Sequence, residues 1–170
     1  MESREYERVV TKYIDTVYRI AISHTKDASD ADDVVQQTFV KLLTKNVNFT
    51  DEEHIKRWLI RVCINECNSL FSSFWRKNVN LFDNNTKEEH VTEESITLSF
   101  TTQEDSDLYE AVQMLPAKCQ IVVHLFYYEG YSTKEIAEII KVREATVRTR
   151  LVRARKLLKG KLTEAWDDEE

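Results

Sequence analysis

The residue types best suited to chemistry lie between Ser132 and Thr163, where ten Lys and Arg residues stand against three Glu. The whole chain has a net charge of −6, so the rest of it is strongly acidic. Arginine presents a planar fork of N–H donors that fits a phosphate or the O6 and N7 atoms of guanine. This charge asymmetry favours a nucleic-acid surface on the basic segment.

The basic segment has the signature of a helix-turn-helix. Ser132, with Glu135 three residues later, forms a capping box that predicts the start of a short helix. Residues 141–144 form the turn, and a last helix is expected from about 145 to 162. The residues expected to face inward are Ile136, Ala137 and Ile140 in the first helix and Val147 and Leu151 in the second.

The side chains left on the outer face of this motif can meet base edges and phosphates. Those near the start of the last helix also profit from free backbone N–H groups, which favour anions. The predicted DNA-contacting residues are Lys141, Arg143, Thr146, Arg148, Thr149, Arg150, Val152, Arg153 and Lys156, with Arg155 beside them. A solvated basic helix on an ordinary bundle is the structural alternative.

A predicted helix over residues 52–77 carries a second polar surface. Charged groups that follow phosphates, together with rings that stack on unpaired bases, are typical of single-stranded DNA binding. The outward residues are Arg57, Arg61, Asn65, Asn68 and Ser72, and the helix ends with Phe71, Phe74, Trp75, Arg76 and Lys77. The residues expected inside are Ile55, Trp58, Leu59, Val62, Cys63 and Leu70, and a core role for Phe71 and Phe74 is the alternative.

With only two Gly and one Pro in 170 residues, the chain favours long helices, and the predicted fold class is all-α. Apolar spacing predicts helices over residues 6–24 and 30–44, the second with a capping box from Ser29 to Asp32. The inward faces are expected to include Val9, Tyr13, Ile14 and Val17 in the first helix and Val35, Phe39, Leu42 and Leu43 in the second.

Residues 80–107 lack helical periodicity and hold eight acidic residues, which indicates a flexible acidic linker; a short helix within it is the alternative. The predicted organisation is a first domain at 1–79, this linker, a four-helix helix-turn-helix domain at 108–163 and an acidic tail at 164–170. In the second domain, Pro116 suits the first turn of a helix over 117–128, and Gly130 suits its C-terminal cap.

Several classes of function are disfavoured. No Gly-rich phosphate loop, paired metal ligands or nucleophile elbow is present, so we expect no enzyme, no metal site and no cofactor. Cys63, Cys67 and Cys119 are expected to be buried thiols. There is no apolar run of about 18 residues, and the charged N-terminus does not resemble a secretory signal. We therefore expect a cytoplasmic protein without membrane insertion.

Dispersed motifs resemble those of one protein family. The segment from Asp30 to Lys41 is similar to region 2.2 of bacterial sigma factors, and residues 58–65 are similar to the segment that follows it. Residues 115–116, 131–137 and 146–155 are similar to region 4. Since the motifs stand in the right order in both halves, the chain resembles the small extracytoplasmic-function (ECF) sigma factors.

The resemblance implies roles for the first half. Asp33, Gln36, Gln37 and Lys41 would dock on the clamp helices of the β′ subunit of core RNA polymerase. The loop from Val47 to Glu53 would help Asn65 capture a flipped base of the melted −10 element. The −10 contacts are accordingly assigned to Arg57, Arg61, Asn65, Asn68, Trp75, Arg76 and Lys77.

The resemblance also implies that the last helix reads the −35 element in the major groove. The hydrophobic side of the 117–128 helix would help hold the β flap, and an anti-sigma factor would mask these surfaces.

Two other functions stay open. A stand-alone helix-turn-helix regulator would bind a palindromic operator without polymerase. A polymerase-binding accessory protein would not melt DNA; Ser69 keeps this alternative open, because the family often has Asp or Asn there.

Overall fold

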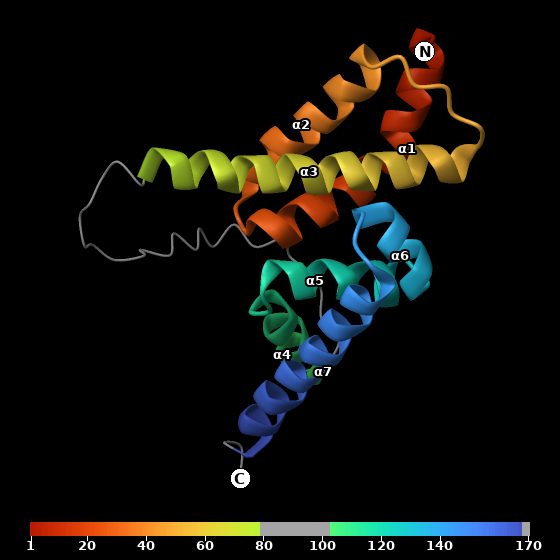
Figure 1. The fold of residues 1–170 in the computed structure, drawn as a ribbon. Helices are drawn as coiled ribbons and strands as arrows, with labels where there is room; N and C mark the ends of the chain where they lie inside the picture. The colour runs from red at the N-terminus through yellow and green to blue at the C-terminus, as the bar shows by residue number, and fades with distance from the viewer. Residues whose placement is uncertain (79–102, 168–170) are drawn as a thin grey trace. The chain divides into compact units, whose positions relative to one another are not determined.

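The computed structural model describes residues 1–78 and 103–167 (Figure 1). The first range belongs to one compact unit and the second range to another. Both units consist of helices, and the described residues contain no strand, which confirms the all-α prediction. Most of the predicted linker at 80–107, and the end of the predicted tail, lie outside the described residues. Helix α4 begins at Gln103, so the last part of the predicted linker is helical.

The first unit packs three helices: α1 (Ser3–Thr25), α2 (Ala28–Thr44) and α3 (Glu52–Asn78). Each helix contacts both of the others. A core forms between them because each helix has one apolar stripe to bury. The residues that fill it include Val9, Val17, Ile20, Ala21, Val34, Phe39, Leu42, Leu59, Ile60, Cys63 and Cys67.

Three details of this unit differ from the sequence predictions. The capping box from Ser29 to Asp32 is wrong, because α2 begins earlier and the Asp27 carboxylate accepts the Asp30 N–H at 2.9 Å. Leu43 and Ile14, predicted to face inward, are 56% and 40% exposed. The three-helix core covers only one stripe of each helix, so apolar residues just outside that stripe stay at the surface.

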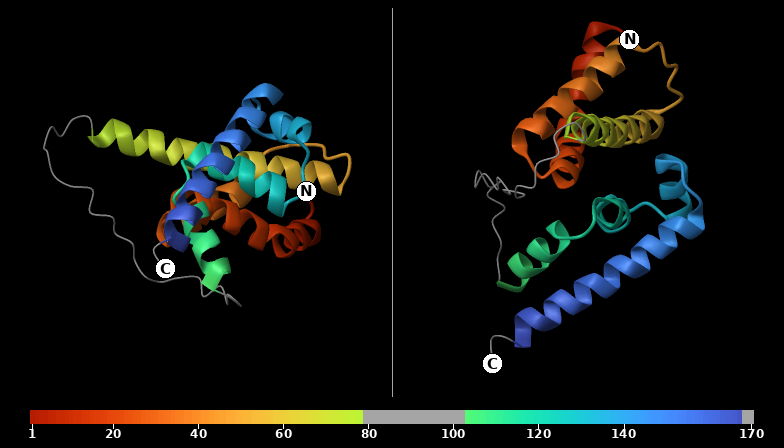
Figure 2. Two further views of the ribbon diagram at one scale, coloured as in Figure 1. Left: turned by 90° about the horizontal axis from the view of Figure 1, so that it is seen from below. Right: turned by 60° about the vertical axis from the view of Figure 1, so that its left-hand side comes forward.

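The second unit comprises α4 (Gln103–Gln113), α5 (Ala117–Val123), the π-helical segment η1 (His124–Tyr128), α6 (Thr133–Ile140) and α7 (Glu144–Asp167). Helix α7 contacts α4, α5 and α6 in turn (Figure 2). The residues that fill the core between them include Leu115, Val122, Leu125, Ile136, Val147, Leu151 and Ala154.

The predicted helix over 117–128 divides into α5 and η1. The Glu129 N–H donates to the carbonyl of His124 at 3.1 Å, five residues back, which is the hydrogen bond of a π-helix. Gly130 follows with φ of 76°, a left-handed conformation that favours glycine, and the predicted C-terminal cap is thereby confirmed. Pro116 is the N-cap residue of α5 and so lies just before its first turn.

Candidate nucleic-acid interface

Helices α6 and α7 form the predicted helix-turn-helix. The capping box is confirmed: the Glu135 N–H donates to Ser132 Oγ at 3.2 Å, and the Ser132 N–H donates to Glu135 Oε2 at 2.8 Å. Lys141 ends α6 in the left-handed conformation, with φ of 55°. The Val142 N–H then donates to the carbonyl of Ala137 at 3.2 Å, which turns the chain sharply toward α7.

Packing between the two helices follows the prediction at most positions. Ile136 and Val147 are fully buried, and Ala137 and Leu151 are nearly so. Ile140 was predicted to face inward but is only half-buried, and Ile139 is buried in its place. This inward stripe determines which side of α7 remains available to a ligand.

The opposite side of α7 is an exposed basic stripe. Its members recur at steps of three and four, so they share one face of the helix. The exposed stripe of α7 consists of Arg148, Thr149, Val152, Arg153 and Lys156. Lys141 and Arg143 are exposed just before or at the start of the helix, whereas Thr146 and Arg150 are half-buried beside the stripe.

Glu144, at the first turn of α7, joins the two helices of the motif. Its Oε1 accepts a hydrogen bond from Thr133 Oγ1 on α6 at 2.8 Å and one from Arg148 Nη2 at 2.7 Å. The Thr133 hydroxyl, and the Arg148 guanidinium beside it, lower the pKa of the Glu144 carboxyl below its ordinary value. Sequence reasoning placed Glu144 only in the turn, although its spacing from Arg148 is that of an i,i+4 ion pair.

Arg155 differs from the stripe residues in its surroundings. Its Nε donates to the Tyr127 hydroxyl at 2.8 Å, and its guanidinium lies 5.9 Å from the Phe126 ring centroid and 5.7 Å from that of Tyr127. These contacts hold Arg155 against η1. The long-range partner could not be read from the local sequence.

The polar face of α3 is partly open. Asn65, Asn68 and Ser72 are exposed, whereas Arg57 and Arg61 are half-buried. Arg57 also forms an ion pair with Glu53 at 3.0 Å. Phe71 is 39% exposed, and its ring centroid lies 5.6 Å from that of His24. For Phe74, Trp75, Arg76 and Lys77 the helical backbone is described, but their predicted side-chain roles lie outside the described part.

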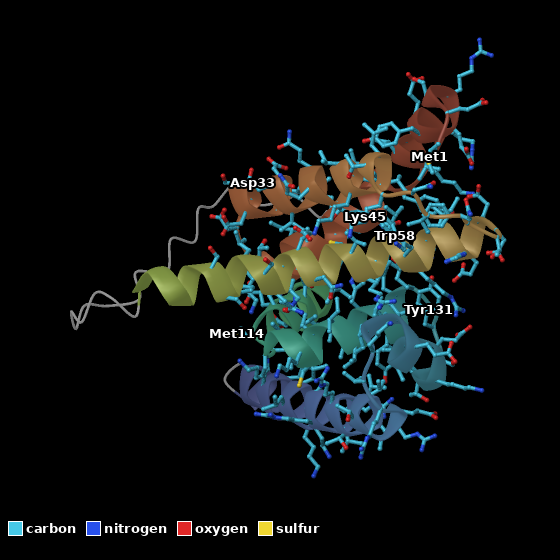
Figure 3. The ribbon with its side chains drawn as sticks, turned by 45° about the horizontal axis from the view of Figure 1, so that its top comes forward. Met1, Asp33, Lys45, Trp58, Met114 and Tyr131 are labelled. Atoms are coloured by element: carbon cyan, nitrogen blue, oxygen red, sulfur yellow. The ribbon has the colours of Figure 1, made fainter. Side chains whose placement is uncertain are left out.

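The loop between α2 and α3 is held against the first turns of α3. The Phe49 ring packs edge-on against His54 and Trp58, with centroid distances of 5.3 and 5.6 Å. The Thr50 N–H donates to His54 Nδ1 at 3.3 Å. The Asp51 carboxylate accepts the His54 N–H at 2.8 Å, which lowers the pKa of Asp51. Trp58, predicted as core, is half-buried and supports this loop from α3 (Figure 3).

Glu52, the first residue of α3, is tied to α1 by three side chains. Arg8 Nη2 lies 2.5 Å from its Oε1, and both Lys12 Nζ and the Tyr13 hydroxyl donate to Oε2 at 2.9 Å. The hydrogen bonds from Arg8, Lys12 and Tyr13 lower the pKa of Glu52 to about 2. Glu52 therefore anchors the end of the α2–α3 loop on α1, and sequence reasoning did not assign it this role.

The predicted clamp-binding residues lie on α2. Asp33, near the start of the helix in Figure 3, is exposed, as are Gln36 and Gln37. Lys41 is half-buried and forms an ion pair with Glu66 of α3. A groove of about 230 Å³ runs between the two helices and is lined by Asp33, Val34, Gln37, Glu66, Ser69, Leu70 and Ser73.

Other kinds of site find little support in the described part. No group of three or more His, Cys, Asp or Glu residues there could hold a metal ion. None of the helices described is both long and apolar enough to cross a membrane. Cys63, Cys67 and Cys119 are buried free thiols, as predicted. The neighbouring Cys67 thiol and burial raise the pKa of Cys63 well above its ordinary value, which disfavours its reactive thiolate form.

Each of the two units matches the model of a known protein family. Residues 9–77 match the model of Sigma-70 region 2, and residues 105–158 match that of Sigma-70 region 4. RNA polymerase sigma factor SigV of Bacillus subtilis is 30% identical over 161 residues, covering 91% of this chain and 89% of SigV. The ECF RNA polymerase sigma factor SigM of the same species is 26% identical, covering 96% of this chain and 98% of SigM. The chain belongs to the ECF sigma factors.

Solved structures agree at the level of the fold. The sigma factor RpoE of Bartonella quintana, solved with the anti-sigma factor NepR, superposes with a TM-score of 0.70 at 23% identity, covering 94% of this chain and 98% of RpoE. CnrH, solved with the cytosolic domain of CnrY, gives a TM-score of 0.57 at 20% identity, covering 99% of this chain and 92% of CnrH.

Membership of the ECF sigma factors assigns a function to each of the two units. The ECF sigma factor described here binds core RNA polymerase and directs promoter-specific initiation, with region 2 recognising the −10 element and region 4 the −35 element. Helices α1 to α3 form region 2, and α4 to α7 form region 4. The stand-alone regulator and the accessory protein are not favoured. The family consists of transcription initiation factors.

Proposed function

We propose that the exposed stripe of α7 reads the −35 element in the major groove. The single observation that carries the proposal is the combination of a buried inward stripe with an opposite exposed face rich in Arg and Lys, on the second helix of a capped helix-turn-helix. Arg148 and Arg153 are assigned to base edges, and Lys141, Arg143 and Lys156 to phosphates. Thr146, Thr149, Arg150 and Val152 complete the contact surface.

Region 2 is proposed to hold the melted −10 strand along α3. Asn65 and Asn68 offer exposed amides further along the helix whose first turns hold the loop, which is ordered by Phe49, Asp51 and Glu52. Arg57 and Arg61 would contact the strand's phosphates, and Trp75, Arg76 and Lys77 would extend the surface. An ordered loop costs less entropy when it captures a flipped base.

The exposed face of α2 is proposed to dock on the β′ clamp helices through Asp33, Gln36 and Gln37. Lys41 would contribute from the edge of this face, since it also forms an ion pair with Glu66 of α3. The hydrophobic side of α5 would help hold the β flap. Because one structural neighbour, the sigma factor RpoE, was solved with an anti-sigma factor, we also propose an anti-sigma partner for this chain. We propose a cytoplasmic location and no catalytic activity of its own.

Run-off transcription with core polymerase, on a promoter library, tests the −35 proposal. Promoter-dependent initiation should require the protein. Arg148→Ala and Arg153→Ala should each lose about 1–3 kcal/mol of discrimination at one −35 position. Lys118→Ala, which removes an exposed charge from α5, is the matched control and should keep the preference. If both α7 variants leave promoter choice and affinity unchanged, the assigned readout face is wrong.

Two further variants test region 2. Asn65→Ala should slow initiation on an intact promoter, and an abasic site at the captured −10 base should erase the difference from wild type. Asp33→Ala with Gln37→Ala should weaken binding to core polymerase, whereas Asp15→Ala, an exposed acid on α1, should not. If the variant with both Asp33→Ala and Gln37→Ala binds core polymerase as tightly as Asp15→Ala does, the clamp assignment is contradicted.

A further inference from the structure

Glu144, the first residue of α7, places an acid beside Arg148 at the N-terminal end of the proposed −35 readout surface. Its Oε1 accepts from Arg148 Nη2 at 2.7 Å and from Thr133 Oγ1 at 2.8 Å. Thr133 is the first residue of α6, directly after the Ser132 cap, so the carboxylate is tied to a well-defined point on the other helix. Glu144 therefore contacts a residue of α6 as well as Arg148 on its own helix.

A carboxylate at this position should, by charge alone, oppose DNA binding. It lies among residues assigned to phosphates and bases, and it would repel the DNA backbone. The hydrogen bond between Glu144 and Arg148, by contrast, should favour discrimination between bases. A guanidinium has five N–H donors in a rigid fork, so a bond through one Nη2 hydrogen leaves donors free to meet a base. The side chain of Arg148 is still 65% exposed.

Reading guanine through O6 and N7 requires the fork to lie in one orientation in the groove. A free arginine samples many rotamers and can instead contact any nearby phosphate. The bond from Thr133 holds the Glu144 carboxylate, and the carboxylate in turn restricts Arg148. The charge of Glu144 also penalises non-specific binding, which depends on phosphate attraction.

We propose that Glu144 is a positioning residue that orients the Arg148 guanidinium and so determines how strongly α7 discriminates one base pair of the −35 element. The proposal rests on the proposed readout by α7. It assigns Thr133 a supporting part, because the Thr133 hydroxyl fixes the carboxylate that Arg148 contacts. The predicted effect is on base preference at one position, which a merely structural role would not produce.

The test is a double-variant cycle in the holoenzyme, made from the full chain and core polymerase. Wild type, Glu144→Ala, Arg148→Ala and the double variant are compared on promoters carrying all four bases at each −35 position. Glu144→Ala should lower discrimination about threefold or more, at the same position where Arg148→Ala flattens it. The double variant should match Arg148→Ala alone, because the positioning residue has nothing left to orient.

Three additional variants sharpen the cycle. Glu144→Gln keeps an acceptor oxygen for both partners and should retain more discrimination than Glu144→Ala. Thr133→Val should reduce discrimination at the same position. Glu138→Ala removes an equal charge from an exposed site on α6 and should leave base preference unchanged. Thermal unfolding of each variant establishes that region 4 stays folded.

Distinct outcomes would overturn the inference. A uniform change in affinity for all sequences would reduce Glu144 to a source of charge repulsion. A change at a position that Arg148→Ala does not affect would mean that Glu144 reads a base itself, as an acceptor from cytosine N4. Additive losses in the double variant would also refute the positioning role. If Arg148→Ala flattens no position, the readout by Arg148 fails, and the role of Glu144 fails with it.

Discussion

The rotational register of α7 can be tested by substituting two adjacent residues. Leu151 is 2% exposed and packs in the core of region 4, whereas Val152 is 48% exposed and belongs to the stripe that we assign to DNA. A rotation of α7 by one residue would bring Val152 into the core and move Leu151 out of it. Leu151→Ala and Val152→Ala therefore make a matched pair.

The expected magnitudes differ widely. Leu151→Ala removes three carbon atoms, worth about 0.8 kcal/mol each in transfer free energy, and leaves a cavity that raises the total cost to about 3–4 kcal/mol. A helical unit of this size has a free energy of unfolding of only about 5 kcal/mol, so most of its stability would be lost. Val152→Ala should change the free energy of unfolding by about 0.5 kcal/mol or less.

The two units must be observed separately, because a two-unit chain need not unfold in one transition. Urea unfolding of the full chain, followed by NMR signals of α7 and of α1, provides this separation. Leu151→Ala should shift the α7 transition to lower urea and leave the α1 transition in place. Val152→Ala should shift neither, but should alter −35 preference in transcription. A cost below about 1 kcal/mol for Leu151→Ala, or above it for Val152→Ala, would refute the assigned register.

Three other changes have defined outcomes. Ser132→Ala removes the side-chain cap of α6 and should lower the free energy of unfolding of region 4 by about 1 kcal/mol, measured by the same urea series. Gly130→Ala should also destabilise region 4, by about 1 kcal/mol, because φ is 76° although a Cβ there would meet no atom; an unchanged transition would contradict this. In region 2, the Glu52 pKa of about 2 lies below the ordinary 4.5, so its stabilisation is present above about pH 4.5 and is lost as the pH falls toward 2. Glu52→Gln should remove this acid sensitivity, seen as a shift of the α1 transition with pH, whereas Glu53→Gln should retain it.

Local patterns were enough to predict much of region 4. The capping box at Ser132 and Glu135 involves atoms only three residues apart, so no distant part of the chain is needed to form it. The positions of Val147 and Leu151 follow from the period of the helix, and both are buried. The exposed face of α7 follows from the same period, because it is the side opposite to them. Its contacts with DNA stay predictions.

Competing local signals explain the predictions that were wrong. Asp27 and Ser29 can both cap a helix, and the choice depends on where α1 ends, with Lys26 in a left-handed turn. Ile139 and Ile140 are equally apolar, and only the packing of α6 against its neighbours selects Ile139 for the core.

The amino-acid sequence by itself determined the helical class, the helix-turn-helix and the basic face, since these depend on composition and on spacings shorter than one or two helical turns. Only the tertiary structure decided which distant groups meet. Glu52 bonds Arg8, Lys12 and Tyr13, which lie about forty residues earlier, and Arg155 bonds Tyr127 of η1. Even Thr133 and Glu144, eleven residues apart, meet only because the turn folds α7 back toward the start of α6. Such pairs depend on how helices pack, and no local period encodes that.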